Sequence, residues 1–318
     1  MPSLSTLPEH STPPVQTALA LHAMDARTAG TMVLLCLVWA LQQISLKAAA
    51  PAISPMLLVA LRSLMALALL AALMWRTAEG LHRRHWRAGA AVGILFALEY
   101  LLVSEALRLT QASHVVVFLY TAPLFAAIGL HWRIPAERLG AVPWAGILLA
   151  FIGIAIAFVG GDSRTSGVAL PSAVMGDALA VLAGTMWGAT TITIRCSTLA
   201  TAPAKETLAY QLMGAFVLLL PAAWFTGQWH FVPSPQLWLH LAFQGLVVSF
   251  ASFLLWFSLL RRYQASRLGV YSFLTPLFGV VLGVWLLGEA IETEFVIGSA
   301  LVLAGIGLVN AGAGLRRR

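Results

Sequence analysis

The chain of 318 residues is 60% hydrophobic and only 10% charged, and its mean hydropathy is +0.87. One water-soluble core cannot bury that much apolar surface, so the composition indicates a protein of the lipid bilayer and argues against a soluble enzyme. The net charge is +7, but the basic residues stand between apolar runs, which argues against a nucleic-acid partner. The two cysteines, Cys36 and Cys196, fall in or at the end of apolar runs and indicate no disulfide framework.

Residues 1–27 are polar and rich in Ser, Thr and Pro, which predicts disorder. Ten apolar runs follow, each close to the ~20 residues that a helix needs to cross a bilayer. The first run ends in small residues that resemble a signal cleavage site, but its length and its partner in an internal repeat predict that it stays in the protein. We therefore predict an all-α membrane protein with ten transmembrane helices, near residues 29–48, 56–74, 88–108, 112–130, 142–160, 175–194, 206–226, 237–259, 266–287 and 294–313.

The two halves of the chain repeat one another. The segment QASHVVVFLYTAPLF at 111–125 returns as QASRLGVYSFLTPLF at 264–278, with seven of fifteen positions identical. A fixed spacing between similar segments indicates an internal duplication. The first spans of the two halves align at a shift of 148, which pairs Trp39 with Trp187, Gln42 and Gln43 with Thr190 and Thr191, and Lys47 with Arg195.

The basic residues predict how the chain is oriented. With the N-terminus inside, fifteen Lys and Arg residues fall in cytoplasmic segments and three on the other side, which predicts that both termini are cytoplasmic. Each half has five spans, so the second half must enter the membrane from the opposite side. Such inverted repeats are typical of secondary transporters, whose substrate sites lie near the midplane between the repeats.

The two five-span halves, the Trp in the first span of each half, the doubled QAS…PLF block and the Glu that follows it in PAERLG and LLGEAI resemble the drug/metabolite transporter superfamily, of the EamA-domain type. The resemblance covers about residues 28–312. It implies an inner-membrane transporter for amino acids, other metabolites or toxic compounds, although some relatives carry sugars or nucleotide sugars. The expected organisation is a disordered cytoplasmic segment 1–27, a first EamA-like repeat 28–160, an external linker 161–173, a second repeat 174–313 and a basic cytoplasmic tail 314–318.

Aromatic and polar side chains at helical spacing are the candidate substrate-binding residues. Side chains at i, i+3 and i+4 share one face of a helix, so Trp39, Gln42 and Gln43 form a stripe at mid-depth. Such a stripe serves either interhelical hydrogen bonding or a pocket for an organic solute with apolar and polar parts. The predicted set is completed by Trp187, Thr190, Thr191, Tyr120, Trp256, Tyr271 and Thr275.

Glu99 lies ~12 residues into the third span, close to the bilayer centre. An ionised carboxylate is costly there, so we expect Glu99 to couple transport to protons, to bind a cationic group of the substrate, or to be a hydrogen-bonded structural acid. Glu105 lies one turn before Arg108 and is expected to form an ion pair with it at the helix end. Arg62, inside the second span, is a further possible partner for Glu105 or for a substrate carboxylate.

Pro123 and Pro276 occupy matching positions of the two halves, near mid-bilayer. Each removes a backbone N–H and frees a carbonyl one turn earlier, which predicts either a packing kink or a hinge beside the cavity. The sequence contains no Walker A motif, no zinc-type cluster of His and Cys and no membrane-embedded Ser–His pair. We therefore predict no enzyme activity, no cofactor and no metal site.

These observations together predict a secondary transporter that works by alternating access. The expected substrates are small metabolites, such as amino acids or related amphiphilic or toxic compounds, exported through a cell inner membrane. The alternatives are a sugar or nucleotide-sugar carrier of the same fold, and a membrane scaffold without flux. The expected partners are a small-molecule substrate and the lipid bilayer, whereas the sequence leaves the substrate, direction, coupling ion and oligomeric state open.

Overall fold

A computed structural model describes residues 25–110, 112–159, 170–287 and 293–311 of the chain. Ten of the helices in this part are long and apolar enough to cross a membrane, which confirms the predicted all-α fold. Six spans are continuous helices: α1 (Ala26–Ala49), α2 (Pro55–Arg76), α6 (Ala141–Val159), α7 (Leu170–Cys196), α8 (Ala204–Phe225) and α13 (Thr293–Ala311).

The other four spans are composite. A short 3₁₀ turn, η1 (Arg83–His85), leads into α3 (Trp86–Leu109), and a second 3₁₀ turn, η2 (Pro135–Glu137), precedes α6. The fourth span is divided into α4 and α5, the eighth contains a π-helix, and the ninth is divided into α11 and α12. Their bounds are α4 Ala112–Leu119, α5 Ala122–Arg133, α9 Pro235–Ala242, η4 Phe243–Ser252 (the π-helix), α10 Phe253–Leu260, α11 Ala265–Tyr271 and α12 Leu274–Leu287.

Local sequence explains several helix starts. The Asp25 side chain accepts a hydrogen bond from the Thr28 backbone N–H at 2.9 Å and so caps α1. These hydrogen bonds hold the pKa of the exposed Asp25 carboxyl below its usual value. Pro55 begins α2, where a missing N–H costs no hydrogen bond and the fixed φ favours the helix.

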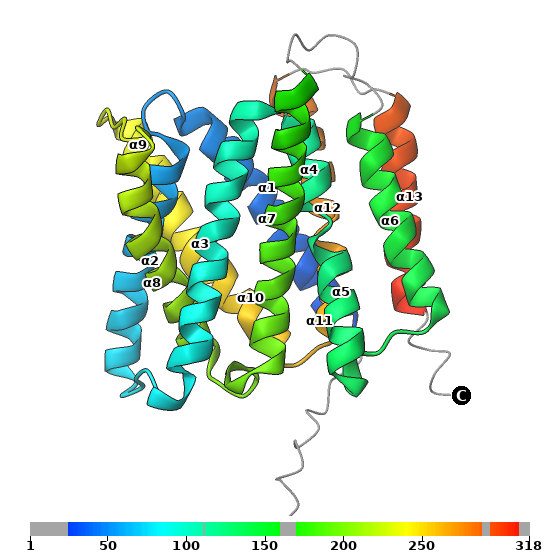
Figure 1. Cartoon of the computed structure of the whole chain (residues 1–318), viewed down its shortest axis with the longest axis horizontal. Helices are drawn as coiled ribbons and strands as arrows, with labels where there is room; N and C mark the ends of the chain where they lie inside the picture. The colour runs from blue at the N-terminus through cyan, green and yellow to red at the C-terminus, as the bar shows by residue number, and fades with distance from the viewer. Residues whose placement is uncertain (1–24, 111, 160–169, 288–292, 312–318) are drawn as a thin grey trace, which may run out of the picture.

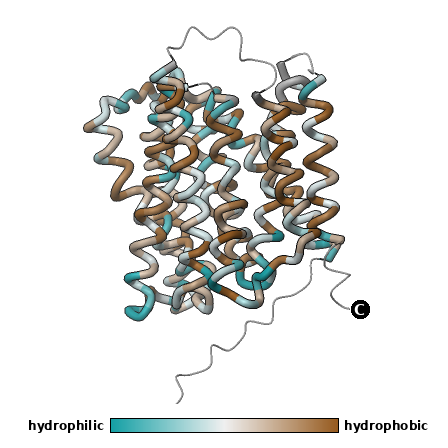
Figure 2. Tube along the Cα trace, turned by 45° about the vertical axis from the view of Figure 1, so that its right-hand side comes forward, coloured by the Kyte–Doolittle hydropathy of each residue, from teal (hydrophilic) through white to brown (hydrophobic). Residues whose placement is uncertain are grey.

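The helices stand side by side in one bundle (Figure 1). The first residues of α1 and the last residues of α13 both lie at the lower end of this view. We call this end of the bundle the terminal end and the other end the opposite end. Hydrophobic residues dominate the length of the helices, and hydrophilic residues gather toward the two ends (Figure 2). Buried apolar side chains from both halves form the main core cluster, among them Leu70, Leu130, Leu208 and Phe273.

Exposed tryptophans lie near both ends of the bundle. Trp75, Trp86 and Trp132 lie at helix ends on the terminal side, while Trp224 and Trp238 lie at helix ends on the opposite side, and all five are exposed. Tryptophan is enriched at the two membrane–water interfaces because its ring is apolar and its N–H is polar. The apolar surface between these two belts is therefore the lipid-facing surface of a multi-pass membrane protein.

Glycines let α6 and α13 approach each other closely along the right-hand edge of Figure 1. A Cβ added to Gly153 would lie 2.6 Å from the carbonyl oxygen of Gly298, and one added to Gly146 would lie 2.7 Å from that of Gly305. Small residues that bring two backbones together are a common basis of helix association in membranes. The last helix of the first half thus packs closely against the last helix of the second half.

Candidate functional site

A cavity of about 180 Å³ lies between the two halves of the bundle. Its walls come from α1, α2 and α3 of the first half and from α7, α8, α10 and α12 of the second. Tyr271 does not line it: this side chain is buried, and its hydroxyl accepts a hydrogen bond from Asn310 Nδ2 at 2.8 Å. The other ten residues predicted for the site all line the cavity: Trp39, Gln42, Gln43, Glu99, Tyr120, Trp187, Thr190, Thr191, Trp256 and Thr275.

Two aromatic pairs form parts of the cavity wall. The ring centroids of Trp39 and Trp256 are 5.6 Å apart in an edge-to-face arrangement, and those of Tyr120 and Trp187 are also 5.6 Å apart. Each pair thus joins helices of different halves. The Trp39 indole N–H donates to Ser252 Oγ at 3.1 Å. Edge-to-face packing and this hydrogen bond fix the rings, so the cavity presents a preformed apolar surface to a ligand.

The threonines on α7 offer acceptors to the cavity. Thr190 Oγ1 donates to the Met186 carbonyl at 2.9 Å, and Thr191 Oγ1 donates to the Trp187 carbonyl at 3.4 Å. Because each hydroxyl hydrogen is used within its own helix, the oxygen lone pairs are left to accept from a ligand. In α1, Gln43 contributes an exposed amide to the lining, and Gln42 is buried.

Glu99 is the only Asp, Glu, Lys or Arg among the described residues that line the cavity. Within the described part of the chain, its carboxylate forms no ion pair within 4 Å. Arg62, on the neighbouring α2, is the cation whose charge acts on Glu99, but its guanidinium is held elsewhere. It donates to Gln244 Oε1 at 2.6 Å and to the Tyr100 hydroxyl at 2.7 Å. Glu99 is therefore an acid that faces the cavity without a bonded counter-ion.

Arg62 does not contact Glu105, which was one of its possible partners. Glu105 instead forms the predicted helix-end ion pair with Arg108, at 2.9 Å. Sequence reasoning missed Gln244, which lies in the π-helix η4, accepts from Arg62 and donates to the Gln42 carbonyl at 2.9 Å. The only signal for Gln244 was an isolated amide in an apolar run.

Both predicted hinge prolines stand at breaks in their helices. Pro123 lies in the first turn of α5, directly after the gap that separates α4 from α5. Pro276 lies in the first turns of α12, after the gap that follows α11. Between the two breaks, an added Cβ on Gly269 would lie 3.6 Å from Pro123 Cβ, so the broken helices of the two halves approach each other. Movement at these breaks stays a prediction.

A buried ion pair closes the bundle at the terminal end. Arg195, near the end of α7, donates to Glu137 of η2 at 2.5 Å and to the Leu260 carbonyl at 2.8 Å. Glu137 also accepts from the Ala265 backbone N–H at 3.1 Å and from Ser266 Oγ at 3.3 Å. The Arg195 and Glu137 side chains are only 3% and 0% exposed. These contacts join η2, α7, α10 and α11, which come from both halves.

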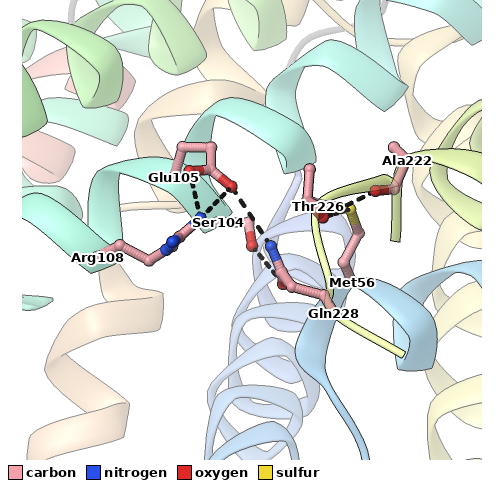
Figure 3. Close-up of polar contacts among 7 residues, drawn as sticks. All are labelled: Met56, Ser104, Glu105, Arg108, Ala222, Thr226 and Gln228. Carbon is pink, nitrogen blue, oxygen red and sulfur yellow. Dashed lines mark hydrogen bonds and ion pairs between the residues drawn. The ribbon is translucent and has the colours of Figure 1, made fainter. Parts of the chain in front are cut away.

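Weaker contacts hold the opposite end (Figure 3). Ser104 donates to Gln228 Oε1 at 3.0 Å, and Gln228 Nε2 lies 3.4 Å from Glu105 Oε1. The Arg108 side chain that completes this group is 61% exposed. The cavity lining extends to this end of the bundle through Leu46, Pro55, Met56, Ser104 and Leu107.

Known proteins share this architecture. The chain is 26% identical over 298 residues to an uncharacterized transporter of Archaeoglobus fulgidus, covering 91% of this chain and 99% of that protein. It is 22% identical over 278 residues to the uncharacterized transporter YoaV of Bacillus subtilis, covering 85% of this chain and 92% of YoaV. A solved crystal structure superposes with a TM-score of 0.76 at 22% identity, covering 88% of this chain and 96% of that one, which shows a shared fold.

The two halves each match the same transporter domain. Residues 27–159 and residues 174–311 both match the EamA-like transporter family, and the two matches together span most of the chain. The matched segments carry the aromatic pairs, Glu99 and the two helix breaks that build the cavity. The chain belongs to the EamA-like transporter family.

Proposed function

We propose that this transporter is a secondary exporter of small metabolites, such as amino acids or related amphiphilic or toxic compounds, in a cell inner membrane. The observation that carries the proposal is the cavity between the inverted halves, with aromatic walls, amide and hydroxyl groups and one unpaired carboxylate. Solutes of mixed character match such a surface, because the rings bury apolar parts and the polar groups fix orientation. Rocking of one half on the other would expose the cavity to each side in turn.

The charge of the lining favours small metabolites over nucleotide sugars. A phosphate-bearing substrate needs Arg or Lys in its site, and none of the described lining residues is basic. Arg62, the nearest candidate, is already bonded to Gln244 and Tyr100. A scaffold without flux would leave the cost of a mid-membrane carboxylate unexplained, since an unpaired charge there is unfavourable by a few kcal/mol.

We further propose that Glu99 couples export to protons. A carboxylate in a cavity that opens alternately to the two sides can take up a proton on one side and release it on the other. One charge crossing the membrane corresponds to ~2.3 kcal/mol per 100 mV, enough for roughly fifty-fold accumulation of substrate. For export, both termini are placed in the cytoplasm, as the distribution of Lys and Arg predicts.

The test is flux in liposomes containing the purified protein. A growth-protection screen against amino-acid analogues, antimetabolites and dyes first selects solutes, which are then measured with and without a pH gradient. We expect Glu99→Gln to abolish pH-driven flux while substrate exchange in the absence of a gradient persists. The matched control is Glu105→Gln, which makes the same change one to two turns along α3 at a residue that is not part of the cavity lining.

Two outcomes would contradict the proposal. Full pH-driven flux in Glu99→Gln would remove this residue from coupling and leave transport itself standing. Flux of no solute in the wild-type protein, in vesicles that a pore-forming peptide proves to be sealed, would support the scaffold.

A further inference from the structure

Outside the cavity, a cluster of two histidines and one glutamate joins the two halves at the terminal end. His82 precedes η1 and His85 ends it, on the connection between α2 and α3, while Glu206 lies in the first turn of α8. One ring nitrogen of each histidine and one carboxylate oxygen all lie within 4.8 Å of one another. Metal–ligand bonds of about 2.0–2.2 Å put two ligand atoms at most about 4.4 Å apart, so the limit of 4.8 Å is slightly wider than one bound ion allows. Small side-chain movements would therefore complete the geometry.

The cluster has buried parts and one accessible part. Glu206 and His85 are each 1% exposed, whereas the His82 side chain is 54% exposed. Glu206 Oε1 accepts from the His82 backbone N–H at 2.7 Å, and Oε2 lies 2.9 Å from His82 Nδ1. An ion could thus enter from water past His82 and meet a carboxylate that is already oriented.

His85 supplies an independent sign of a missing partner. Its Nδ1 atom is buried and has no hydrogen-bond partner, and buried polar atoms in proteins nearly always have one. Its Nε2 atom lies 2.9 Å from Arg84 Nε. Arg84 is exposed, so this arginine can turn into solvent when the imidazole binds an ion.

The donor set selects the class of ion. Two imidazoles and one carboxylate are ligands typical of Zn²⁺ and of neighbouring transition metals, whereas Mg²⁺ and Ca²⁺ prefer oxygen ligands throughout. The His82 and His85 rings are nearly perpendicular, with centroids 5.9 Å apart, so their nitrogens can point at one ion without the rings colliding. Water at the exposed side of His82 would fill the fourth position.

We propose that His82, His85 and Glu206 bind Zn²⁺ or a similar transition-metal ion, which fastens the α2–α3 connection of the first half to α8 of the second. This site departs from the expectation that the chain has no metal site. His82 and His85 are three positions apart, but the third ligand, Glu206, lies 124 positions after His82, so no local pattern marks the cluster in the sequence. Metal bound there would stabilise the terminal end, where Arg195 and Glu137 also join the halves.

The experiment is Zn²⁺ binding by the full-length protein in detergent, with any affinity tag and any bound metal removed beforehand. Competition with a chromophoric chelator should show one Zn²⁺ per chain and no comparable binding of Mg²⁺. His85→Ala and Glu206→Gln should each weaken binding by about tenfold or more. The control is His114→Ala, since His114 also contacts a carboxylate, Asp177 Oδ2 at 3.2 Å, away from the cluster.

Thermal unfolding provides the second measurement. Zn²⁺ should raise the Tm of the wild type and of His114→Ala, but not that of the cluster variants. If His85→Ala fails to fold, His82→Ala removes a ligand whose side chain is mostly exposed and is expected to fold. Absence of stoichiometric binding, binding that survives both histidine changes, or equal affinity for Mg²⁺ would overturn the proposal. Neither measurement depends on flux, so a failure of the proposed transport function would not affect this result.

Discussion

The two ends of the bundle are held by ion pairs of opposite character. At the terminal end, Arg195 and Glu137 are almost completely buried and bonded to three further groups. At the opposite end, Arg108 is 61% exposed and Glu105 is 29% exposed, and both belong to a single helix. Breaking a buried pair leaves an uncompensated charge at a cost of about 3–5 kcal/mol, whereas an exposed pair contributes about 0–1 kcal/mol. Of these two ion pairs, the one at the terminal end is therefore expected to contribute more to stability, although hydrogen bonds such as Thr110 Oγ1 to Asp177 Oδ1, at 2.7 Å, also join the two halves at the opposite end.

The internal duplication allows the basic residues at the two ends to be compared directly. Arg195 aligns with Lys47, which lies at the opposite end near the end of α1. Lys47 is exposed and forms no ion pair with any residue that the structure describes. On the proposed alternating-access mechanism, the two ends of an inverted repeat would exchange roles when access changes sides. A basic residue that is paired at one end and unpaired at the other is what a carrier closed toward one side should have.

The largest expected effect comes from breaking the buried pair. Glu137→Gln leaves the Arg195 guanidinium buried without its counter-charge, and we expect the free energy of unfolding to fall by about 3–5 kcal/mol. Unfolding in mixed detergent micelles, followed by circular dichroism, measures the change. The double variant Glu137→Gln with Arg195→Met should recover most of the loss, because it removes both charges. A loss below about 1 kcal/mol in the single variant would show that this end is no more firmly held than the other.

Access to the cavity is the next largest expected difference. In a background with Cys36→Ala and Cys196→Ala, we expect Gln43→Cys to react with a membrane-impermeant thiol reagent added from the opposite side. Reaction from the terminal side should be at least about tenfold slower, which corresponds to about 1.4 kcal/mol in favour of the state closed there. The control is Cys36→Ala alone, which keeps the exposed Cys196 at the terminal end of α7 and should show the reverse preference. Equal reaction of Gln43→Cys from both sides would contradict a closed terminal end.

Much of this architecture could be predicted from the sequence. The length of the apolar runs and the duplication predicted ten spans, and the prolines predicted where the fourth and ninth spans break. The i, i+3, i+4 spacing placed Trp39 and Gln43 on the cavity wall. Tyr271 does not line the cavity, because its side chain is buried against α13, where its hydroxyl accepts a hydrogen bond from Asn310.

The rest depended on tertiary packing. No residue pattern marks the π-helix η4, since its sequence is as apolar as that of an ordinary span. Arg195 was interpreted as a topology signal, and Glu137 as part of a family motif, although 58 positions separate them. Which loop glutamate meets which helix-end arginine is decided by how the helices assemble. Glu289, the second motif glutamate, lies outside the described residues.

A smaller effect is expected at the helix breaks. If the gap before Pro276 must flex when the closed end opens, Pro276→Ala should allow a more continuous ninth span and slow transport. We expect about 1 kcal/mol in the barrier, or roughly fivefold in flux, with near-normal expression. Pro123→Ala is the matched change in the other half, and the double variant tests both. Unchanged flux in the two single variants and in the double variant would show that both prolines serve helix packing only.

The smallest expected effect is at the opposite end, from Arg108→Ala. Removing this guanidinium breaks its contact with Glu105, yet the carboxylate is 29% exposed and can be solvated by water. Gln228 Nε2 also stays within 3.4 Å of Glu105 Oε1, so the loop between α8 and α9 keeps its contact with α3. We therefore expect the free energy of unfolding to change by less than about 1 kcal/mol, in the same micelle assay as for Glu137→Gln.

Repeating the unfolding measurement at different salt concentrations distinguishes the exposed ion pair from the buried one. Salt screens exposed charges with a Debye length of about 10 Å at 0.1 M, but buried pairs are screened much less. Raising the salt concentration should erase whatever difference Arg108→Ala makes, and it should leave the deficit of Glu137→Gln in place. A loss of several kcal/mol in Arg108→Ala that persists in salt would mean that both ends are locked. An occluded carrier, rather than one closed at the terminal end alone, would then describe the structure.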